Sequence, residues 1–233
     1  MLSPGLPIDD LAATFARERM VRIPSILIPD AARQVRDCLE RQTPWCLAFL
    51  EGGRPVCLSP GEVRAMDPRE RSARVARIHA EACDGFQFLY NTYMMVEAYR
   101  QGRDPHLILH RLLEVLAGED FVRLVRRVTG KDDLRRVDAQ ATRYLAGHFL
   151  GRHDDHGESR TRRVAYVLGL SPGWRPEWGG LLHFHDADGG VTRSFVPAYN
   201  VLTLFEVPAM HSVSWVAPFA GAARYSITGW LKR

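Results

Sequence analysis

The chain has 233 residues, of which 46% are hydrophobic and 25% are charged. These proportions are those of ordinary globular proteins, and they exclude extended disorder and a collagen-like structure. The formal net charge of +4 arises from interspersed basic and acidic residues rather than from a basic block, so composition gives no support to nucleic-acid binding. No apolar run approaches the roughly 20 residues that a membrane helix needs, and a membrane-spanning protein is not expected.

The first residues and the cysteines bear on the cellular compartment. The segment MLSPGLPIDDL lacks a basic region and carries Asp9 and Asp10 where a signal peptide is apolar, so we expect a cytoplasmic protein. Four cysteines occur without CxxC spacing: Cys38, Cys46, Cys57 and Cys83. This usage predicts free thiols rather than a disulfide framework or a zinc site.

Residues 1–133 are predicted to be mainly helical. Apolar residues recur at helical spacing in five segments, which are 9–20, 29–41, 68–83, 106–117 and 120–128. A short β-like run covers 21–27, and 44–58 contains two apolar runs around Glu-Gly-Gly-Arg-Pro, which is typical of a hairpin. We interpret the aromatic residues Phe86, Phe88, Tyr90 and Tyr93 as core, with 90–93 as the candidate for a pocket wall.

From Val137 onward the apolar pattern alternates. Short strands are predicted at near-regular spacing over 137–141, 164–170, 180–184, 191–196, 201–207, 212–216 and 225–231. Such a series with Gly, Pro and Asp turns is typical of an antiparallel sandwich or barrel. Because no linker or repeat separates the halves, we predict one domain over 1–233, with helical support from 1–133 and a β-core from 134–233.

One segment and two later residues carry the chemistry. His153 and Asp155 are two apart, so on an extended segment their side chains leave on the same face. His211 can add a third ligand, and two imidazoles with one carboxylate form the triad that holds Fe(II) with positions left open. Arg224 lies on the last predicted strand, where a guanidinium suits a carboxylate ligand.

Several spaced motifs resemble those of one enzyme family. From about Ala141 to the C-terminus the chain resembles the 2-oxoglutarate/Fe(II)-dependent dioxygenase superfamily, and within it the prolyl-hydroxylase-like branch. The matching residues are His153-Asp154-Asp155, Arg162-Arg163-Val164, Gly179-Gly180-Leu181-Leu182, His211, and Arg224 within RYSITGW. The resemblance implies an α+β protein with a double-stranded β-helix core of the jelly-roll or cupin-like kind.

The resemblance also implies site residues and cofactors. His153, Asp155 and His211 would form the catalytic metal site for Fe(II), and Arg224 would pair with the distal carboxylate of 2-oxoglutarate. Tyr144 and Ser226 would add contacts to this cosubstrate. Molecular oxygen would be consumed, with ascorbate as an auxiliary reductant. The implied reaction couples oxidative decarboxylation of 2-oxoglutarate to hydroxylation of a C–H bond, with a prolyl residue of a protein as the first choice.

One position departs from the pattern of relatives that hydroxylate the hypoxia factor. In those enzymes a tyrosine on the strand after the HxD motif binds the cosubstrate carboxylate, and Leu168 aligns with it here. Tyr166 lies two residues earlier and would face the same side of a strand. The role of this position in cosubstrate binding is therefore open.

Alternative functions stay open at this point. The substrate could be a free amino acid or small metabolite instead of a protein, or the chain could be a catalytically silent module that binds or senses 2-oxoglutarate. His183 and His185 form a second same-face pair, but the glycine and glutamate of the cupin pattern are absent around them. The sequence has no stripe of basic residues that would bind a nucleic-acid substrate. Exposed edge strands would permit a homodimer.

Overall fold

The computed structural model describes residues 1–156 and 161–233. Within these residues the helices are α1 (Ile8–Glu18), α2 (Pro29–Arg41), α3 (Pro60–Ala65), α4 (Pro68–Glu81), α5 (Met95–Arg100), α6 (Ile108–Ala117), α7 (Glu119–Thr129) and the short 3-10 helix η1 (Pro176–Trp178). No helix of the described residues is long and apolar enough to cross a membrane.

The strands of the described residues join in one antiparallel sheet. They are β1 (Met20–Pro24), β2 (Cys46–Glu51), β3 (Arg54–Leu58), β4 (Phe88–Tyr93), β5 (Arg136–Val137), β6 (Gln140–Tyr144), β7 (Phe149–His153), β8 (Arg162–Leu170), β9 (Leu182–His185), β10 (Val191–Phe195), β11 (Tyr199–Glu206), β12 (His211–Val213) and β13 (Arg224–Lys232). The main path runs β1-β11-β8-β13-β6-β4-β7-β12-β9-β10, while β2 pairs with β3 and β4, and β5 pairs with β13.

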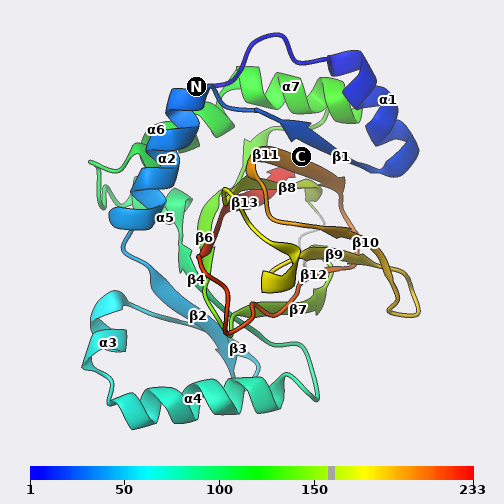
Figure 1. Cartoon of the computed structure of the whole chain (residues 1–233). Coiled ribbons are helices and arrows are strands. Elements are labelled where there is room, and N and C mark those ends of the chain that lie inside the picture. The colour runs from blue at the N-terminus through cyan, green and yellow to red at the C-terminus, as the bar shows by residue number, and fades with distance from the viewer. Residues whose placement is uncertain (157–160) are drawn as a thin grey trace.

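The sheet curls into two facing limbs (Figure 1). One limb is β1-β11-β8-β13-β6, the other is β7-β12-β9-β10, and β4 joins them. Residues from both limbs line the cavity between them, such as Val167 of β8 and Leu182 of β9. This is the arrangement of a double-stranded β-helix, and it confirms the predicted α+β class.

The helices cover the outer face of the first limb. In Figure 1, α1 and α7 lie beside β1, while α2, α5 and α6 lie along the flank. Alternate residues of the strands point toward these helices and belong to one buried cluster. For example, the rings of Phe121 in α7 and Tyr166 in β8 pack edge to face with their centroids 6.1 Å apart. Full burial of a large apolar side chain contributes about 1.5–3 kcal/mol, so this cluster supports the limb.

A smaller layer lies at the other end of the molecule. Helices α3 and α4 pack beside the β2–β3 hairpin (Figure 1), where Phe49, Ile78 and Leu89 form a separate buried cluster. Both helices begin at side-chain caps. Ser59 and Glu62 form a capping box at α3, and the Asp67 side chain accepts hydrogen bonds from backbone N–H groups at the start of α4.

A pair of glycines brings two segments of the second limb close together. Gly179 and Gly180 both have positive φ, at 68° and 63°, and a Cβ on Gly179 would lie 2.0 Å from the carbonyl oxygen of Trp215. Only glycine accepts both the conformation and the contact. The Gly-Gly pair therefore admits the bridge between Gly179 and Val216 that precedes β9.

Most predicted elements occur within a few residues of their expected bounds. The helix expected over 29–41 is α2, and the hairpin expected within 44–58 is β2–β3. The sequence did not indicate strand β4, whose aromatic residues were interpreted as core, nor the short helices α3 and α5. Strand β4 lies between β6 and β7 in the sheet, so the N-terminal half supplies a central strand as well as helices.

Acid should destabilise the fold in part through His148. This residue is 8% exposed, and burial lowers its pKa from 6.5 to about 4, although a hydrogen bond with the Arg143 backbone acts to raise it. The unfolded chain takes up a proton near pH 6.5 and the folded chain only near pH 4, so the free energy of unfolding falls as the pH drops through this window. We expect a loss of about 2 kcal/mol between pH 7 and pH 5 from this group.

Urea unfolding of metal-free protein at both pH values measures this effect. The loss on acidification should be smaller by about 2 kcal/mol in His148→Gln, whereas His106→Gln, at an exposed histidine, should behave like the wild type. An equal loss in all three proteins would contradict the assignment to His148.

Candidate metal and carboxylate site

Two paired strands bring the three candidate metal ligands together. His153 ends β7, Asp155 follows two residues later, and His211 begins β12 directly opposite His153 in the register. The Nε2 atoms of His153 and His211 lie 3.6 Å and 3.5 Å from the two carboxylate oxygens of Asp155. Their ligand atoms all lie within 4.8 Å of one another, and the described residues contain no other such group of three.

Backbone carbonyl groups orient both imidazoles. The Nδ1 atom of His153 is 3.0 Å from the Gly151 oxygen, and that of His211 is 2.8 Å from the Ala209 oxygen. With a proton on each Nδ1, both rings donate to these carbonyls and keep a lone pair on Nε2. Burial lowers the pKa of His211 to about 4, helped by His153, so its ring is neutral at physiological pH.

The charge at this site suits a divalent cation. Burial acts to raise the pKa of Asp155, but the adjacent imidazoles of His153 and His211 outweigh it, and the net pKa is lowered. The carboxylate is therefore ionised, and no described Lys or Arg side chain forms an ion pair with it. Two neutral nitrogens and one carboxylate oxygen on one side of a cavity fit the facial triad of non-haem iron.

The triad opens into a cavity of about 490 Å³ between the two limbs. Arg224, at the start of β13, lines the same cavity and is 4% exposed. Its guanidinium carbon lies 4.9 Å from the ring centre of Tyr144, and its Nη1 atom has no hydrogen-bond partner among the described residues. A buried guanidinium without an acidic partner is costly, and a ligand carboxylate would supply two acceptors at once.

The other two predicted cosubstrate residues also line this cavity. Tyr144 is opposite Arg224 in the pairing of β6 with β13, and burial raises the pKa of its hydroxyl, which stays protonated. The Ser226 hydroxyl is 2.8 Å from that of Thr142. The sequence analysis did not single out Thr142, although alternation along β6 puts it on the same face as Tyr144.

The aromatic run of β4 is part of the cavity rather than core alone. Phe86, Phe88 and Tyr90 line the cavity, and the Tyr90 ring stacks on Tyr144 with centroids 5.2 Å apart. Tyr93 matches the interpretation as core, since it is buried and its hydroxyl donates to Asp104, whereas Tyr90 matches the alternative that residues 90–93 form a pocket wall. The two-residue spacing of 86, 88 and 90 was the available signal for a common face.

Leu168 does not occupy the position expected from the resemblance. It is buried in the cluster on the helix side of β8, whereas Val167 and Ala165 line the cavity. Tyr166 shares the face of Leu168, and its hydroxyl donates to the Asp138 carbonyl 2.8 Å away. Strand alternation therefore gives the inward position to Val167, and Leu168 does not line the cavity. Tyr166 borders the cavity, but its hydroxyl is engaged by the Asp138 carbonyl.

His183 and His185 lie on the face of β9 opposite the cavity. Their neighbours Leu182 and Phe184 pack inward, toward Phe205, while His185 is hydrogen-bonded to the Ser212 hydroxyl at 2.8 Å. Neither histidine lines the cavity of the triad. A cupin-type metal site at this pair is therefore not supported.

Comparison with known proteins agrees with this geometry. Residues 139–232 match the family model for the 2OG-Fe(II) oxygenase superfamily. The chain is 29% identical over 185 residues to prolyl 3-hydroxylase OGFOD1 of Mus musculus and 34% identical over 141 residues to that of Xenopus laevis, covering 75% and 58% of this chain. It spans only 32% and 26% of these relatives' length.

Solved structures show the same fold at lower identity. A Pseudomonas putida prolyl-4-hydroxylase matches with a TM-score of 0.55 at 18% identity, covering 97% of this chain and 98% of that one. A Trichoplax adhaerens prolyl hydroxylase, in complex with a peptide fragment of the hypoxia inducible factor oxygen degradation domain, matches with a TM-score of 0.64 at 16% identity, covering 97% and 88%. His153, Asp155, His211 and Arg224 all lie inside residues 139–232, the segment that matches the 2OG-Fe(II) oxygenase superfamily.

Proposed function

We propose that the protein is an Fe(II)- and 2-oxoglutarate-dependent dioxygenase that hydroxylates a prolyl residue of a protein. The observation that carries this proposal is the shared cavity. The triad with its single carboxylate, Asp155, and the buried guanidinium of Arg224 both line it, and neither charge is paired with an oppositely charged side chain of the described residues. A cation at the triad and a dicarboxylate reaching Arg224 would neutralise both charges at once.

Each residue has a distinct role in this proposal. His153, Asp155 and His211 hold Fe(II), and Arg224 binds the distal carboxylate of 2-oxoglutarate, with the protonated Tyr144 and Ser226 hydroxyls beside it. Iron, 2-oxoglutarate and O₂ supply the oxidising chemistry, which converts 2-oxoglutarate to succinate and CO₂ and adds one oxygen atom to the substrate. The aromatic wall of β4 excludes water and positions the substrate near the triad.

The substrate class is inferred from relatives and from the cavity mouth. Two relatives are named prolyl 3-hydroxylases, and one structural neighbour holds a peptide. Phe86 is 48% exposed, and its ring centre lies 5.6 Å from that of His153. An exposed aromatic ring at the rim offers an apolar surface to a pyrrolidine ring, which favours a prolyl residue over a charged free amino acid.

The cofactor pair can be tested by anaerobic titration. Metal-free protein receives Fe(II) and then 2-oxoglutarate while the visible charge-transfer band is recorded. The wild type should develop the band, and Arg224→Ala should need at least about tenfold more 2-oxoglutarate because the distal carboxylate loses its partner. Arg175→Ala, at an exposed arginine, should match the wild type, whereas folded, iron-loaded wild type without a band would overturn the proposal.

Measurements of Fe(II) affinity test whether the triad, and not the pair His183 and His185, is the iron site. Asp155→Asn and His211→Ala should each weaken Fe(II) binding by more than about 100-fold, because each removes a direct ligand, while changes outside the ligand shell cost less. His185→Ala should bind iron like the wild type. Equilibrium competition with a chelator measures these affinities, and an equal loss in His185→Ala would argue against the triad as the iron site.

The rim aromatic ring should affect substrate rather than cosubstrate. With proline-containing peptides as substrates, Phe86→Ala should raise KM about tenfold through the loss of apolar contact and leave the charge-transfer titration unchanged. Phe219→Ala, at another exposed aromatic residue, serves as control. Mass spectrometry should detect one added oxygen on proline; turnover only with free amino acids or small metabolites would assign the substrate to that class instead.

A further inference from the structure

A second cavity lies on the reverse face of the strands that wall the first. It has a volume of about 330 Å³ and is bounded by β2, β4, the end of β6 and helices α3 and α4; we call it the posterior cavity. Alternation separates the two spaces: Tyr90 and Tyr144 line the first cavity, whereas Asn91 and Arg143, the adjacent residues, line the second. A single layer of backbone lies between them.

Two arginines that form no ion pair with a described acidic side chain line the posterior cavity. The Arg143 Nε atom donates to the Asn91 side-chain oxygen at 3.2 Å, and the guanidinium carbon lies 5.1 Å from the centre of the Trp45 ring. Burial lowers the pKa of Arg143, and Tyr225 opposes this shift. Arg71 of α4 also lines the cavity. Neither arginine forms an ion pair with a described Asp or Glu side chain.

Another arginine of the same helix shows the contrast. Arg74 lies one turn further along α4 and forms ion pairs with Glu51 at 2.9 Å and Glu70 at 3.4 Å. Its charge is compensated within the protein. Arg71 and Arg143 both line the posterior cavity instead, and two guanidinium groups can bind the oxygens of a carboxylate or phosphate.

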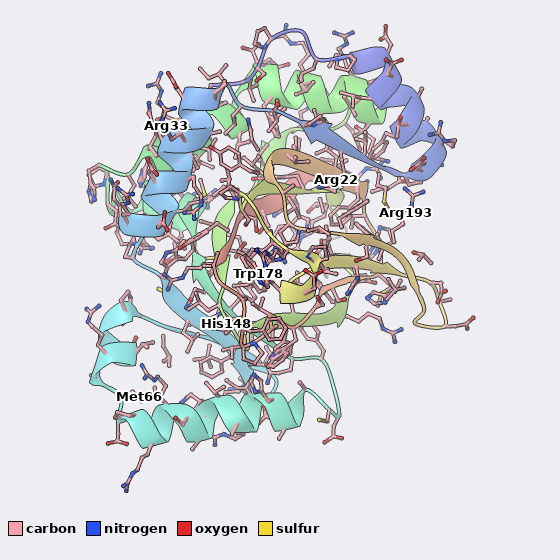
Figure 2. The ribbon with its side chains drawn as sticks, in the orientation of Figure 1. Arg22, Arg33, Met66, His148, Trp178 and Arg193 are labelled. Atoms are coloured by element: carbon pink, nitrogen blue, oxygen red, sulfur yellow. The ribbon has the colours of Figure 1, made fainter. Side chains whose placement is uncertain are left out.

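The rest of the lining sets the shape of the ligand. Asn91 and His148 are 7% and 8% exposed and add polar groups, with His148 lying toward α3 and α4 at the end of the barrel (Figure 2). The remaining wall is mostly apolar and includes Trp45, Leu89 and Leu145. Such a mixture of apolar walls with a few convergent polar groups is typical of small-molecule sites.

We propose that the posterior cavity binds a small organic anion, with its carboxylate or phosphate group between Arg71 and Arg143 and its apolar part against Trp45. This site is separate from the iron and 2-oxoglutarate chemistry, and it requires no metal.

Nitrogen–proton correlation spectra of metal-free protein test the site with three probes: phenyl phosphate, benzoate and inorganic phosphate. The indole N–H of Trp45, which donates to the Leu39 carbonyl at 3.0 Å, and the side-chain amide of Asn91 report on this cavity. At least one of the aromatic anions should shift both signals with a Kd of about 1 mM or tighter, and inorganic phosphate should bind more weakly. The better aromatic anion identifies the preferred acid group.

Matched substitutions on α4 distinguish binding in the posterior cavity from nonspecific attraction of anions to basic residues and from binding in the cavity of the triad. Arg71→Met should weaken the aromatic anion about tenfold, whereas Arg77→Met, at an exposed arginine of the same helix that is not part of the lining, should not. Arg71 is exposed, so its loss leaves the core intact. No shift at Trp45 and Asn91, equal losses in both variants, or shifts abolished by Arg224→Ala but not by Arg71→Met would each overturn the proposal.

Discussion

The alternation of side chains along antiparallel strands is the constraint on which the rest of the structure depends. On β13, Arg224, Ser226 and Thr228 line the cavity, while Tyr225 and Ile227 enter the helix-covered core. A shift of one residue in register would exchange the two sets. It would bury Arg224 and Ser226 under the helices and expose apolar residues to the cavity. Packing of the helix-side core therefore also fixes the chemistry of the opposite face.

The same cavity is lined by two buried groups of opposite charge, Asp155 and Arg224. Neither forms an ion pair with an oppositely charged described side chain. Buried charges of this kind cost free energy unless they are paired. The helix-side core, with large side chains such as Phe121 and Tyr166 fully buried, provides stability that can offset this cost. These two charges would favour a cation beside Asp155 and an anion beside Arg224.

The sequence was sufficient for the triad and insufficient for the walls around it. His153, Asp155 and His211 could be predicted because the chemistry requires specific residue types at short spacing, and Arg224 because a guanidinium suits a carboxylate. Phe88 was interpreted as core because the sequence does not show which face of a strand meets a cavity. Leu168 was aligned with a tyrosine that faces the cosubstrate in relatives, whereas Val167 faces the cavity here. An alignment that is wrong by one residue exchanges the two faces of a strand.

Strand β4, which lies between β6 and β7, contributes residues to both cavities. Tyr90 faces the triad and stacks on Tyr144, whose ring in turn lies against Arg224. The next residue, Asn91, faces the posterior cavity and accepts a hydrogen bond from Arg143. Antiparallel pairing fixes these neighbours rigidly, because a displacement of Asn91 or Arg143 moves the same backbone that carries Tyr90 and Tyr144. The strand that sequence analysis did not detect is thus the one that connects the two sites.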